Sequence, residues 1–415
     1  MRNIKILKNL KNKKILVRVD FNTPIKNGKV LDNFRLKAAM PTIKYLQKKK
    51  ARVILISHLG NPSENKKLKI KDKKHILNIK NKFSLRPVAK YLKIKFVNDC
   101  LGKKVEKAKK EMKPGQVILL ENLRFYEGEK KNDQVFAKHL ASLGDLYVNE
   151  AFSVCHRTDA SVNSLPKFLP AYAGLNLEKE VKKLKQVLEK PQKPLIVILG
   201  GAKISTKIGI LKNLVQKADA LIIGGAMANN FLKVQGFNVS QSIYEKEMFK
   251  ETKAILKRCK NKIILPIDVR IKWQNKISAK GGPAFGWKNI KISELNKIGK
   301  NFIILDIGKE TSALFSLRIK EAKTIVWNGP MGFFEDRLFA GGTKTIAREI
   351  LSNQKAKKII GGGETIEAFR LTRKKLGGSN LFVSSGGGAM LEFLAGERLP
   401  GLEALRTDYA DLSKH

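Results

Sequence analysis

Short apolar runs alternate with amphipathic stretches along most of the chain. In the first half the runs are rich in β-branched residues and lack apolar–polar alternation, which is typical of parallel strands covered on both faces. Between the runs, apolar residues recur at helical spacing. The pattern predicts strands at residues 14–19, 52–57, 116–120 and 145–148, and helices near residues 34–49, 85–93, 102–112 and 132–143.

A second series of the same kind follows a proline-punctuated stretch at residues 189–194. Two such series predict an α/β protein with two doubly wound, Rossmann-like parallel-sheet domains. We expect a domain at residues 1–174, a hinge helix or linker at residues 175–194, and a second domain at residues 195–403. The second series predicts strands at residues 195–199, 220–223, 262–269, 324–327, 358–360 and 381–383.

Length and composition agree with this division. A chain of 415 residues is too long for one ordinary core, and a hydrophobic content of 43% allows two full-sized ones. The apolar runs are too short to cross a bilayer, and the basic N-terminal stretch lacks the apolar segment of a secretory signal. Cys100, Cys155 and Cys259 are widely spaced, so we expect neither a disulfide framework nor a paired-cysteine metal site. These features favour a cytoplasmic protein.

The charge balance is strongly basic. The chain carries 83 Lys and Arg against 36 Asp and Glu, a formal net charge of +47, which is one signature of nucleic-acid binding. Most of the excess is lysine scattered along the chain, without a Cys/His finger, a heptad zipper or an aromatic RNA-binding strand. This distribution favours solvated surface charge. We expect the lysine-rich residues 61–82 to form a mobile surface insertion.

Polar and cationic residues follow the predicted strands of the first half. Ligands bind beyond the carboxyl ends of the strands in such folds, so these residues should meet at one edge of the sheet. Arginine pairs with two oxygens of a carboxylate or phosphate. A lone arginine is more often a surface ion pair, but repetition at successive strand ends predicts an anion-binding pocket. The residues are Asp20, Asn22, Arg35, His58, Asn61, Glu121, Asn122, Arg124, Asn149, Glu150, His156 and Arg157.

Glycine-rich loops follow the strands of the second half. Glycine lets an anion approach the backbone, and free amides at a helix N-terminus favour negative charge. Several such loops predict a nucleotide or phosphate cleft, although neither a Walker-type nor a GxGxxG motif is present. Lys203 and Lys207 lie one helical turn apart after the first of these strands. Glu364 suits a phosphate-bound Mg²⁺, with charge compensation at a helix N-terminus as the alternative.

Together the motifs resemble the phosphoglycerate kinase family. They occur in that family's order over nearly the whole chain: RVDFNTP, FRLKAAMPTI, SHLGNP, LLENLRF, GGAKISTKI, VWNGPMGFFE, GGGET and SSGGGAMLEFLAGERLPG. The resemblance implies the glycolytic reaction in which 1,3-bisphosphoglycerate and Mg-ADP yield 3-phosphoglycerate and Mg-ATP. It also implies a monomer, while the scattered charge and the short apolar runs predict no nucleic-acid or membrane partner. Its first domain would bind phosphoglycerate, its second would bind nucleotide, and residues 404–415 would pack back on the first.

The resemblance also assigns roles to residues at matching motif positions. Arg35, Lys207 and Gly387 are implied to contact the transferring group, Gly387 together with Gly386 and Gly388, and Glu364 is implied to hold Mg²⁺. The implied substrate-binding residues are Asp20, Asn22, Arg35, His58, Asn61, Arg124 and Arg157. The implied nucleotide-binding residues are Lys203, Lys207, Gly225, Gly308, Gly329, Met331, Glu335, Gly362, Gly363, Glu364 and Thr365.

Two of these positions depart from the family's usual pattern. Asn61 stands where the family usually has arginine, which removes a charged contact worth roughly 1.5–3 kcal/mol. Glu364 stands where the family usually has aspartate, so its carboxylate must reach the metal with one extra methylene. These departures leave an inactive relative that serves as a scaffold as one alternative to an active enzyme. The net charge of +47 leaves a nucleic-acid-binding protein as the other.

Overall fold

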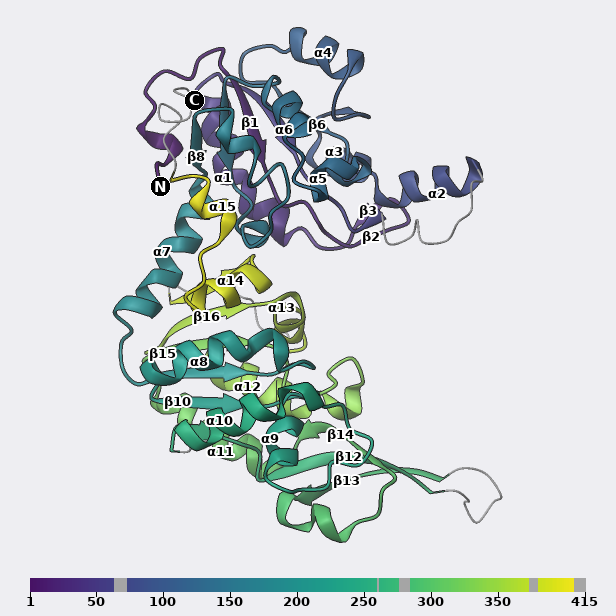
Figure 1. Ribbon diagram of the computed structural model, residues 1–415, viewed down its shortest axis with the longest axis vertical. Helices are drawn as coiled ribbons and strands as arrows, with labels where there is room; N and C mark the ends of the chain where they lie inside the picture. Colours follow the sequence, from purple (N-terminus) through teal and green to yellow (C-terminus); the bar gives the residue numbers. More distant parts are fainter. Residues whose placement is uncertain (63–72, 260, 276–283, 373–379, 407–415) are drawn as a thin grey trace. The chain divides into compact units, whose positions relative to one another are not determined.

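The computed structural model describes residues 1–62, 73–259, 261–275, 284–372 and 380–406, and the chain divides into two compact units (Figure 1). Unit 1 comprises Met1–Lys182 together with the chain from Arg398 onward. Unit 2 comprises Lys183–Glu397. The division falls inside helix α7 (Leu175–Glu189), which lies within the predicted linker.

A parallel sheet forms the centre of unit 1. In the described part of the chain its six strands lie in the order β5-β6-β4-β1-β7-β8. The four predicted strands are confirmed, whereas β5 and β8 are each too short for a periodic signal. The strands are β1 (Lys14–Arg18), β4 (Arg52–Ile56), β5 (Lys95–Val97), β6 (Val117–Leu120), β7 (Leu146–Asn149) and β8 (Ala171–Ala173).

Helices of unit 1 form where apolar residues recur at helical spacing. Leu36 and Ile43 of the first helix pack on Val17 and Val53 of the sheet, which buries one helix face in the core. The predicted helices are confirmed as α1 (Phe34–Lys48), α3 (Arg86–Leu92), α4 (Lys103–Lys110) and α6 (Gln134–Ala141). The unit also contains α5 (Glu127–Lys130), α15 (Pro400–Glu403) and the hairpin β2 (Ile25–Lys26) and β3 (Lys29–Val30).

Residues 398–406 pack within unit 1, where Figure 1 shows α15 in yellow. The Gly401 amide donates a hydrogen bond to the Cys155 carbonyl at 2.9 Å. A Cβ at Gly401 would lie 2.5 Å from a Val162 methyl group, so the contact requires glycine. Of the predicted returning tail, residues 407–415 lie outside the described residues.

The lysine-rich insertion contains a helix that the sequence analysis did not predict. Helix α2 covers Lys73–Phe83, and residues 63–72 lie outside the described residues. Ile79 and Phe83 have the i, i+4 spacing of one helix face. Its described side chains, from Leu77 onward, are all at least partly exposed, which agrees with a surface position.

A second parallel sheet forms the centre of unit 2. In the described residues its six strands lie in the order β11-β10-β9-β15-β16-β17. They are β9 (Leu195–Leu199), β10 (Ala220–Ile223), β11 (Ile263–Ile264), β15 (Thr324–Asn328), β16 (Lys357–Gly361) and β17 (Leu381–Ser384). Its helices are α8 (Ile208–Lys217), α9 (Ala228–Val234), α10 (Phe249–Cys259), α11 (Lys309–Glu321), α12 (Gly341–Ser352), α13 (Gly363–Arg370) and α14 (Gly387–Leu394).

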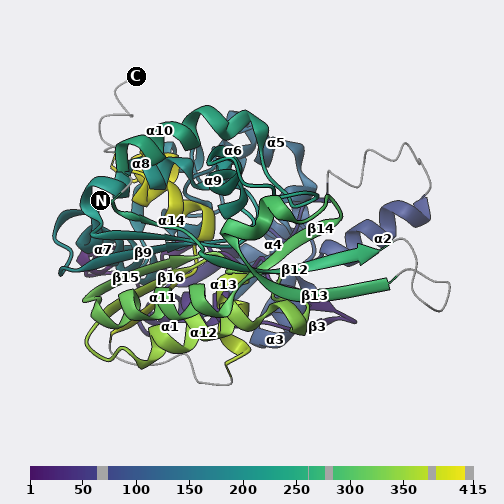
Figure 2. The same ribbon diagram turned by 90° about the horizontal axis from the view of Figure 1, so that it is seen from below.

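The prediction of a single strand at residues 262–269 is wrong. The parallel strand β11 ends at Ile264, and the chain passes Pro266, which has no amide hydrogen to donate to a sheet. It then enters a separate antiparallel sheet of β12 (Asp268–Asn275), β13 (Ala284–Lys291) and β14 (Phe302–Ile307). Figure 2 shows β12 and β13 extending as a two-stranded arm. The prediction of parallel strands alone in this half is therefore incomplete, because the half also contains an antiparallel sheet.

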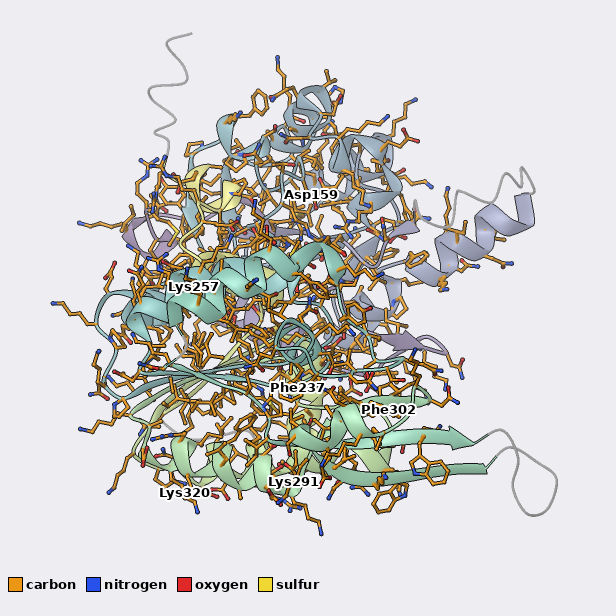
Figure 3. The ribbon with its side chains drawn as sticks, turned by 60° about the horizontal axis from the view of Figure 1, so that its bottom comes forward. Asp159, Phe237, Lys257, Lys291, Phe302 and Lys320 are labelled. Carbon is orange, nitrogen blue, oxygen red and sulfur yellow. The ribbon has the colours of Figure 1, made fainter. Side chains whose placement is uncertain are left out.

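The antiparallel sheet has a small core of its own. Phe302 belongs to it, and Phe237 packs against it from the segment after α9 (Figure 3). Lys257, Lys291 and Lys320 are exposed on three different elements, so the basic side chains at these positions are solvated. No helix in the described residues is long and apolar enough to cross a membrane.

A buried carboxyl group, Glu150, holds the start of α7. It is 3% exposed, and its oxygens accept hydrogen bonds from the Thr42 hydroxyl at 2.8 Å and the Asn176 amide at 3.0 Å. Burial raises the pKa of Glu150 to about 8, against the opposing effect of these hydrogen bonds. The first turn of α7 therefore rests on a group that titrates near neutral pH.

We predict that Glu150 makes stability depend on pH. The folded chain holds a proton that the unfolded chain loses near pH 4.3, so stability falls as pH rises from there to about 8. Relative to Glu150→Gln, the wild-type free energy of unfolding should fall by up to about 1.4 kcal/mol per pH unit over this range. Urea denaturation between pH 5 and 9 measures the difference. Parallel profiles for the two proteins would contradict the prediction.

Candidate functional site

The carboxyl ends of the unit 1 strands meet at one edge of the sheet. The register pairs Arg18 at the end of β1 with Ile56 of β4 and with Asn149 of β7. The polar segments that follow these strands are therefore neighbours in space although they are distant in sequence. This geometry brings together side chains from four loops, as the sequence pattern predicts.

Asp20 and Asn22 position Arg35 within this edge. One Asp20 oxygen lies 2.8 Å from Arg35 Nη1, and the same nitrogen donates to the Asn22 carbonyl at 3.0 Å. The Ser153 hydroxyl donates to Asp20, and the Asn22 side chain accepts from the Gly60 amide at 2.9 Å. Arg35 is 31% exposed, so its guanidinium is held in place while part of it faces solvent.

Arg124 is held in a similar way by the loop after β4. Its Nη1 donates to the Gly60 carbonyl at 2.7 Å, and its Nη2 lies 3.4 Å from the carboxylate of Asp159, which Figure 3 labels. The Asn122 side chain accepts from the Leu59 amide at 3.1 Å and donates to the Leu59 carbonyl at 2.7 Å. Arg124 is therefore fixed against the SHLGNP turn. Asn61 lies in the same turn and is partly exposed.

His58 lies among the arginines of this edge and is 1% exposed. Burial lowers the pKa of His58 well below its ordinary value, and neighbouring positive charges lower it further. The neighbours are Arg18, Arg124, Arg157 and Arg35. A neutral histidine surrounded by guanidinium groups forms a strongly positive pocket, which favours an anion with several oxygens.

Sequence reasoning missed two residues of this pocket. Arg18 is fully buried at the end of β1, and Asp159 pairs with Arg124. Arginine inside an apolar strand is rare enough to have served as a signal for Arg18. Asp159 carries no such signal, because its pairing depends on two loops that only the fold brings together.

The glycine loops of unit 2 pack backbone against backbone. The Gly201 amide donates to the Pro330 carbonyl at 2.8 Å, and the Gly225 amide donates to the Met331 carbonyl at 2.9 Å. A Cβ at Gly225 would lie 2.5 Å from the Gly201 nitrogen, and one at Gly329 would lie 2.3 Å from the Gly200 carbonyl oxygen. Glycine at these positions therefore allows three loops to meet at the end of the sheet.

Two charged side chains converge on Gly201. A Cβ built there would lie 3.3 Å from Lys207 Nζ and 4.0 Å from a carboxylate oxygen of Glu364. Burial lowers the pKa of Lys207, while the charges of Glu364 and Glu245 oppose this shift. Lys203 lies four residues before Lys207 and is exposed. Two lysines beside glycine loops form the kind of environment that favours an anion such as a phosphate.

The GGGET and SSGGGA loops lie side by side. A Cβ at Gly387, the first residue of α14, would lie 3.2 Å from the Gly362 Cα. The Thr365 hydroxyl accepts a hydrogen bond from the Gly329 amide at 2.7 Å, which ties this region to the loop after β15. Gly363 has open space where its side chain would be. The structure thus brings Gly362, Gly363, Thr365 and Gly387 together, with Gly386 and Gly388 flanking the last.

A cavity of about 310 Å³ opens beside these loops, which is large enough for a small ligand. Of the predicted nucleotide positions, Gly225, Met331, Glu335 and Glu364 line it. Gly308 does not line it, and its amide instead donates to the Asp268 carbonyl at 3.0 Å. Several lining residues were missed by the sequence analysis because they belong to the unpredicted antiparallel sheet: Val269, Ile303, Ile304, Leu305, Asp306 and Ile307.

The donor set at Glu364 fits one kind of metal. Among the described residues, no group of three or more His, Cys, Asp or Glu side chains is placed to hold a metal ion. A single exposed carboxylate beside a phosphate site suits Mg²⁺, which is usually bound through one or two carboxylates plus substrate phosphates and water. It does not suit a structural zinc ion, which needs four protein ligands.

The glycine packing predicts a contrast between two substitutions. Gly225→Ala places a methyl group 2.5 Å from the backbone of Gly201 at φ +63°, so the loops must separate. Gly236→Ala has a similar positive φ of +91° but no atom within 4 Å, so it should cost only about 1–2 kcal/mol of backbone strain. The urea midpoint of unit 2 should fall clearly further for Gly225→Ala. Equal shifts for the two variants would contradict the close packing.

Comparison with known proteins gives a consistent result. The family model described as phosphoglycerate kinase matches residues 4–397. The phosphoglycerate kinase of Dictyoglomus turgidum is 43% identical over 408 residues, covering 96% of each chain. That of Pseudothermotoga lettingae is 44% identical over 406 residues, covering 95% of this chain and 96% of the relative.

Solved structures agree with the sequence matches. The phosphoglycerate kinase structure from Coxiella burnetii has a TM-score of 0.77 and 37% identity, and covers 97% of this chain and 98% of that one. The one from Pyrococcus horikoshii has a TM-score of 0.80 and 30% identity, and covers 98% of both chains. The order of motifs, the two parallel sheets and these full-length matches show that the chain belongs to the phosphoglycerate kinase family.

Proposed function

We propose that this chain is an active kinase of glycolysis. It transfers a phosphoryl group reversibly between 1,3-bisphosphoglycerate and Mg-ADP, giving 3-phosphoglycerate and Mg-ATP. The observation that carries the proposal is that each unit holds its own group of charged side chains, of a different kind in each. Unit 1 gathers guanidinium groups around His58, and unit 2 places Lys207 and Glu364 at a glycine-lined cavity.

The acceptor chemistry suits the pocket of unit 1. Phosphoglycerate is a small anion with a carboxylate and a phosphate, and arginine can bind either group through two hydrogen bonds. The carboxylate is already deprotonated at neutral pH, so the reaction needs no general base. A pocket of guanidinium groups around a neutral histidine supplies the binding that such a substrate requires. We assign Asp20, Asn22, Arg35, His58, Asn61, Arg124 and Arg157 to this site.

The nucleotide suits the cavity of unit 2. Its base would lie against the mostly apolar walls beside Met331, and its phosphates would reach Lys203 and Lys207 near Gly201. Glu364 would hold Mg²⁺, which neutralises phosphate charge when bound. We keep Gly225, Gly329, Glu335, Gly362, Gly363 and Thr365 as nucleotide-site residues. Gly308 contributes by supporting the start of α11 next to the cavity.

Positioning and charge neutralisation account for catalysis in this scheme. Phosphoryl transfer spreads negative charge over the transferring oxygens, and fixed cations and amides stabilise that charge. We assign this role to Arg35, Lys207 and the Gly387 amide. Since the acceptor and the nucleotide are bound by separate units, turnover needs a conformational step that brings them into line, with α7 as the connecting element.

The two alternatives have weaker support. The residues that would serve the reaction are retained and held in place, which disfavours a role as an inactive scaffold. Exposed lysines on separate elements disfavour a dedicated nucleic-acid site. We further propose a cytoplasmic protein, because the buried free thiols of Cys100, Cys155 and Cys259 suit a reducing compartment. We propose a monomer on the family resemblance alone.

A coupled assay with purified protein, ATP and 3-phosphoglycerate tests the proposal. We expect turnover that depends on Mg²⁺ and disappears when the metal is chelated. Absence of turnover with both substrates and Mg²⁺ would support the scaffold reading. Salt-dependent binding of a nucleic-acid duplex that ATP does not displace would support the nucleic-acid reading.

We predict that Arg35→Ala lowers kcat at least about a hundredfold, with a smaller change in KM, because Arg35 stabilises charge that develops during transfer. Arg318→Ala provides a control, since Arg318 is an exposed arginine paired at 3.3 Å with Glu321 on α11. The control should leave kcat unchanged. Near-normal turnover by Arg35→Ala would remove Arg35 from the catalytic residues.

A further inference from the structure

Arg18 differs from Arg35 and Arg124 because all three nitrogens of its guanidinium group have partners within unit 1: the Ser161 hydroxyl, the Val19 carbonyl and His58. It is fully buried at the end of β1. Its Nη2 lies 3.1 Å from Nδ1 of His58, at hydrogen-bond distance. A guanidinium group donates hydrogen bonds and accepts none, so Nδ1 of His58 must be the acceptor. Arg18 therefore acts on the pocket through His58.

The contact determines where the His58 proton lies. A neutral imidazole has one protonated nitrogen, and acceptance at Nδ1 places the hydrogen on Nε2. Burial and the surrounding arginines lower the pKa of His58, so the doubly protonated ring is disfavoured. Nε2 is buried and has no hydrogen-bond partner within the described residues. A buried polar atom of this kind normally has a partner, and a substrate oxygen would provide one.

A buried chain of hydrogen bonds fixes Arg18 itself. Its Nε donates to the Ser161 hydroxyl at 2.8 Å, and that hydroxyl donates to Glu129 at 2.6 Å. The other Glu129 oxygen accepts from the Ser161 amide at 3.0 Å. Glu129 is fully buried in α5, and burial raises the pKa of its carboxyl group, although the positive charge of Arg18 opposes this shift. Each bond in the chain has one consistent direction, from Arg18 through Ser161 to Glu129.

We propose that Arg18 is a positioning residue that holds His58 in its Nε2–H tautomer, and that His58 thereby donates a hydrogen bond to an oxygen of bound phosphoglycerate. Ser161 and Glu129 orient Arg18 for this purpose. The inference rests on the proposed function for the identity of the ligand. The tautomer itself follows from contacts within unit 1 and can be observed without turnover.

The first test is spectroscopic. In ¹⁵N-histidine-labelled protein, two-bond proton–nitrogen correlations distinguish the tautomers, and loss of a signal in His58→Phe assigns His58. We expect the Nε2–H form in the wild type, and a shift of this signal when 3-phosphoglycerate is added. In Ser161→Ala we expect a mixture of tautomers, because Arg18 loses its anchor. An Nδ1–H ring in the wild type, or a signal unmoved by 3-phosphoglycerate, would overturn the proposal.

The second test is kinetic. Ser161→Ala should raise KM for 3-phosphoglycerate about tenfold, the effect of weakening one hydrogen bond to a charged group, and should leave KM for ATP unchanged. The matched control is Ser164→Ala, which removes a buried hydroxyl from the same segment. Ser164 bonds to Asn132 at 2.7 Å and Gln134 at 3.2 Å and has no bond to Arg18 among the described contacts. The control should leave KM for 3-phosphoglycerate unchanged.

A double variant separates positioning from general damage. If Ser161 acts through His58, Ser161→Ala should add nothing to KM in a His58→Phe background. Equal effects in both backgrounds would show a structural role and overturn the proposal. Wild-type protein with the Nε2–H tautomer but no turnover would instead refute the proposed function. A turning-over enzyme with the other tautomer would refute only the present inference.

Discussion

The unit 1 site depends on holding several guanidinium groups close together against their mutual repulsion. The parallel sheet forces this arrangement, because its register brings the ends of β1, β4, β6 and β7 to one edge. Buried or partly buried carboxylates compensate for part of the charge, with Asp20 beside Arg35 and Asp159 beside Arg124. The positive charge that remains is directed at the pocket. An anionic ligand bound there would complete the neutralisation.

The candidate anion site of unit 2 is built from glycine loops instead of guanidinium groups. Its glycine loops pack backbone against backbone, and the Gly201, Gly225 and Gly329 amides donate hydrogen bonds within the unit. Gly225 and Gly329 have positive φ angles and approach neighbouring backbone more closely than a Cβ allows. Lys207 and Glu364 lie beside these loops and place opposite charges there. The candidate anion site of unit 1 is thus built from side-chain charge, and that of unit 2 from close-packed glycine loops with charged side chains beside them.

Prediction from sequence succeeded where a signal is local. The strand at residues 14–19 and the helix near residues 34–49 were found because burial imposes a periodic pattern on neighbouring residues. The antiparallel sheet was missed because the apolar run at residues 262–269 hides a change of sheet at Pro266. The cavity walls at Val269 and Leu305 were missed for the same reason. Asp159 and Glu129 were missed because their partners lie in other loops.

The sequence by itself determined the two-domain α/β class, the order of the motifs and the kinds of residue available at each strand end. These properties depend on neighbours along the chain. Only the tertiary structure decided which of those residues meet, that Arg18 contacts Nδ1 of His58, and that Gly308 supports the cavity without lining it. Hydrogen-bond direction and charge act over a few ångströms in space, and those distances are set by packing between segments far apart in sequence.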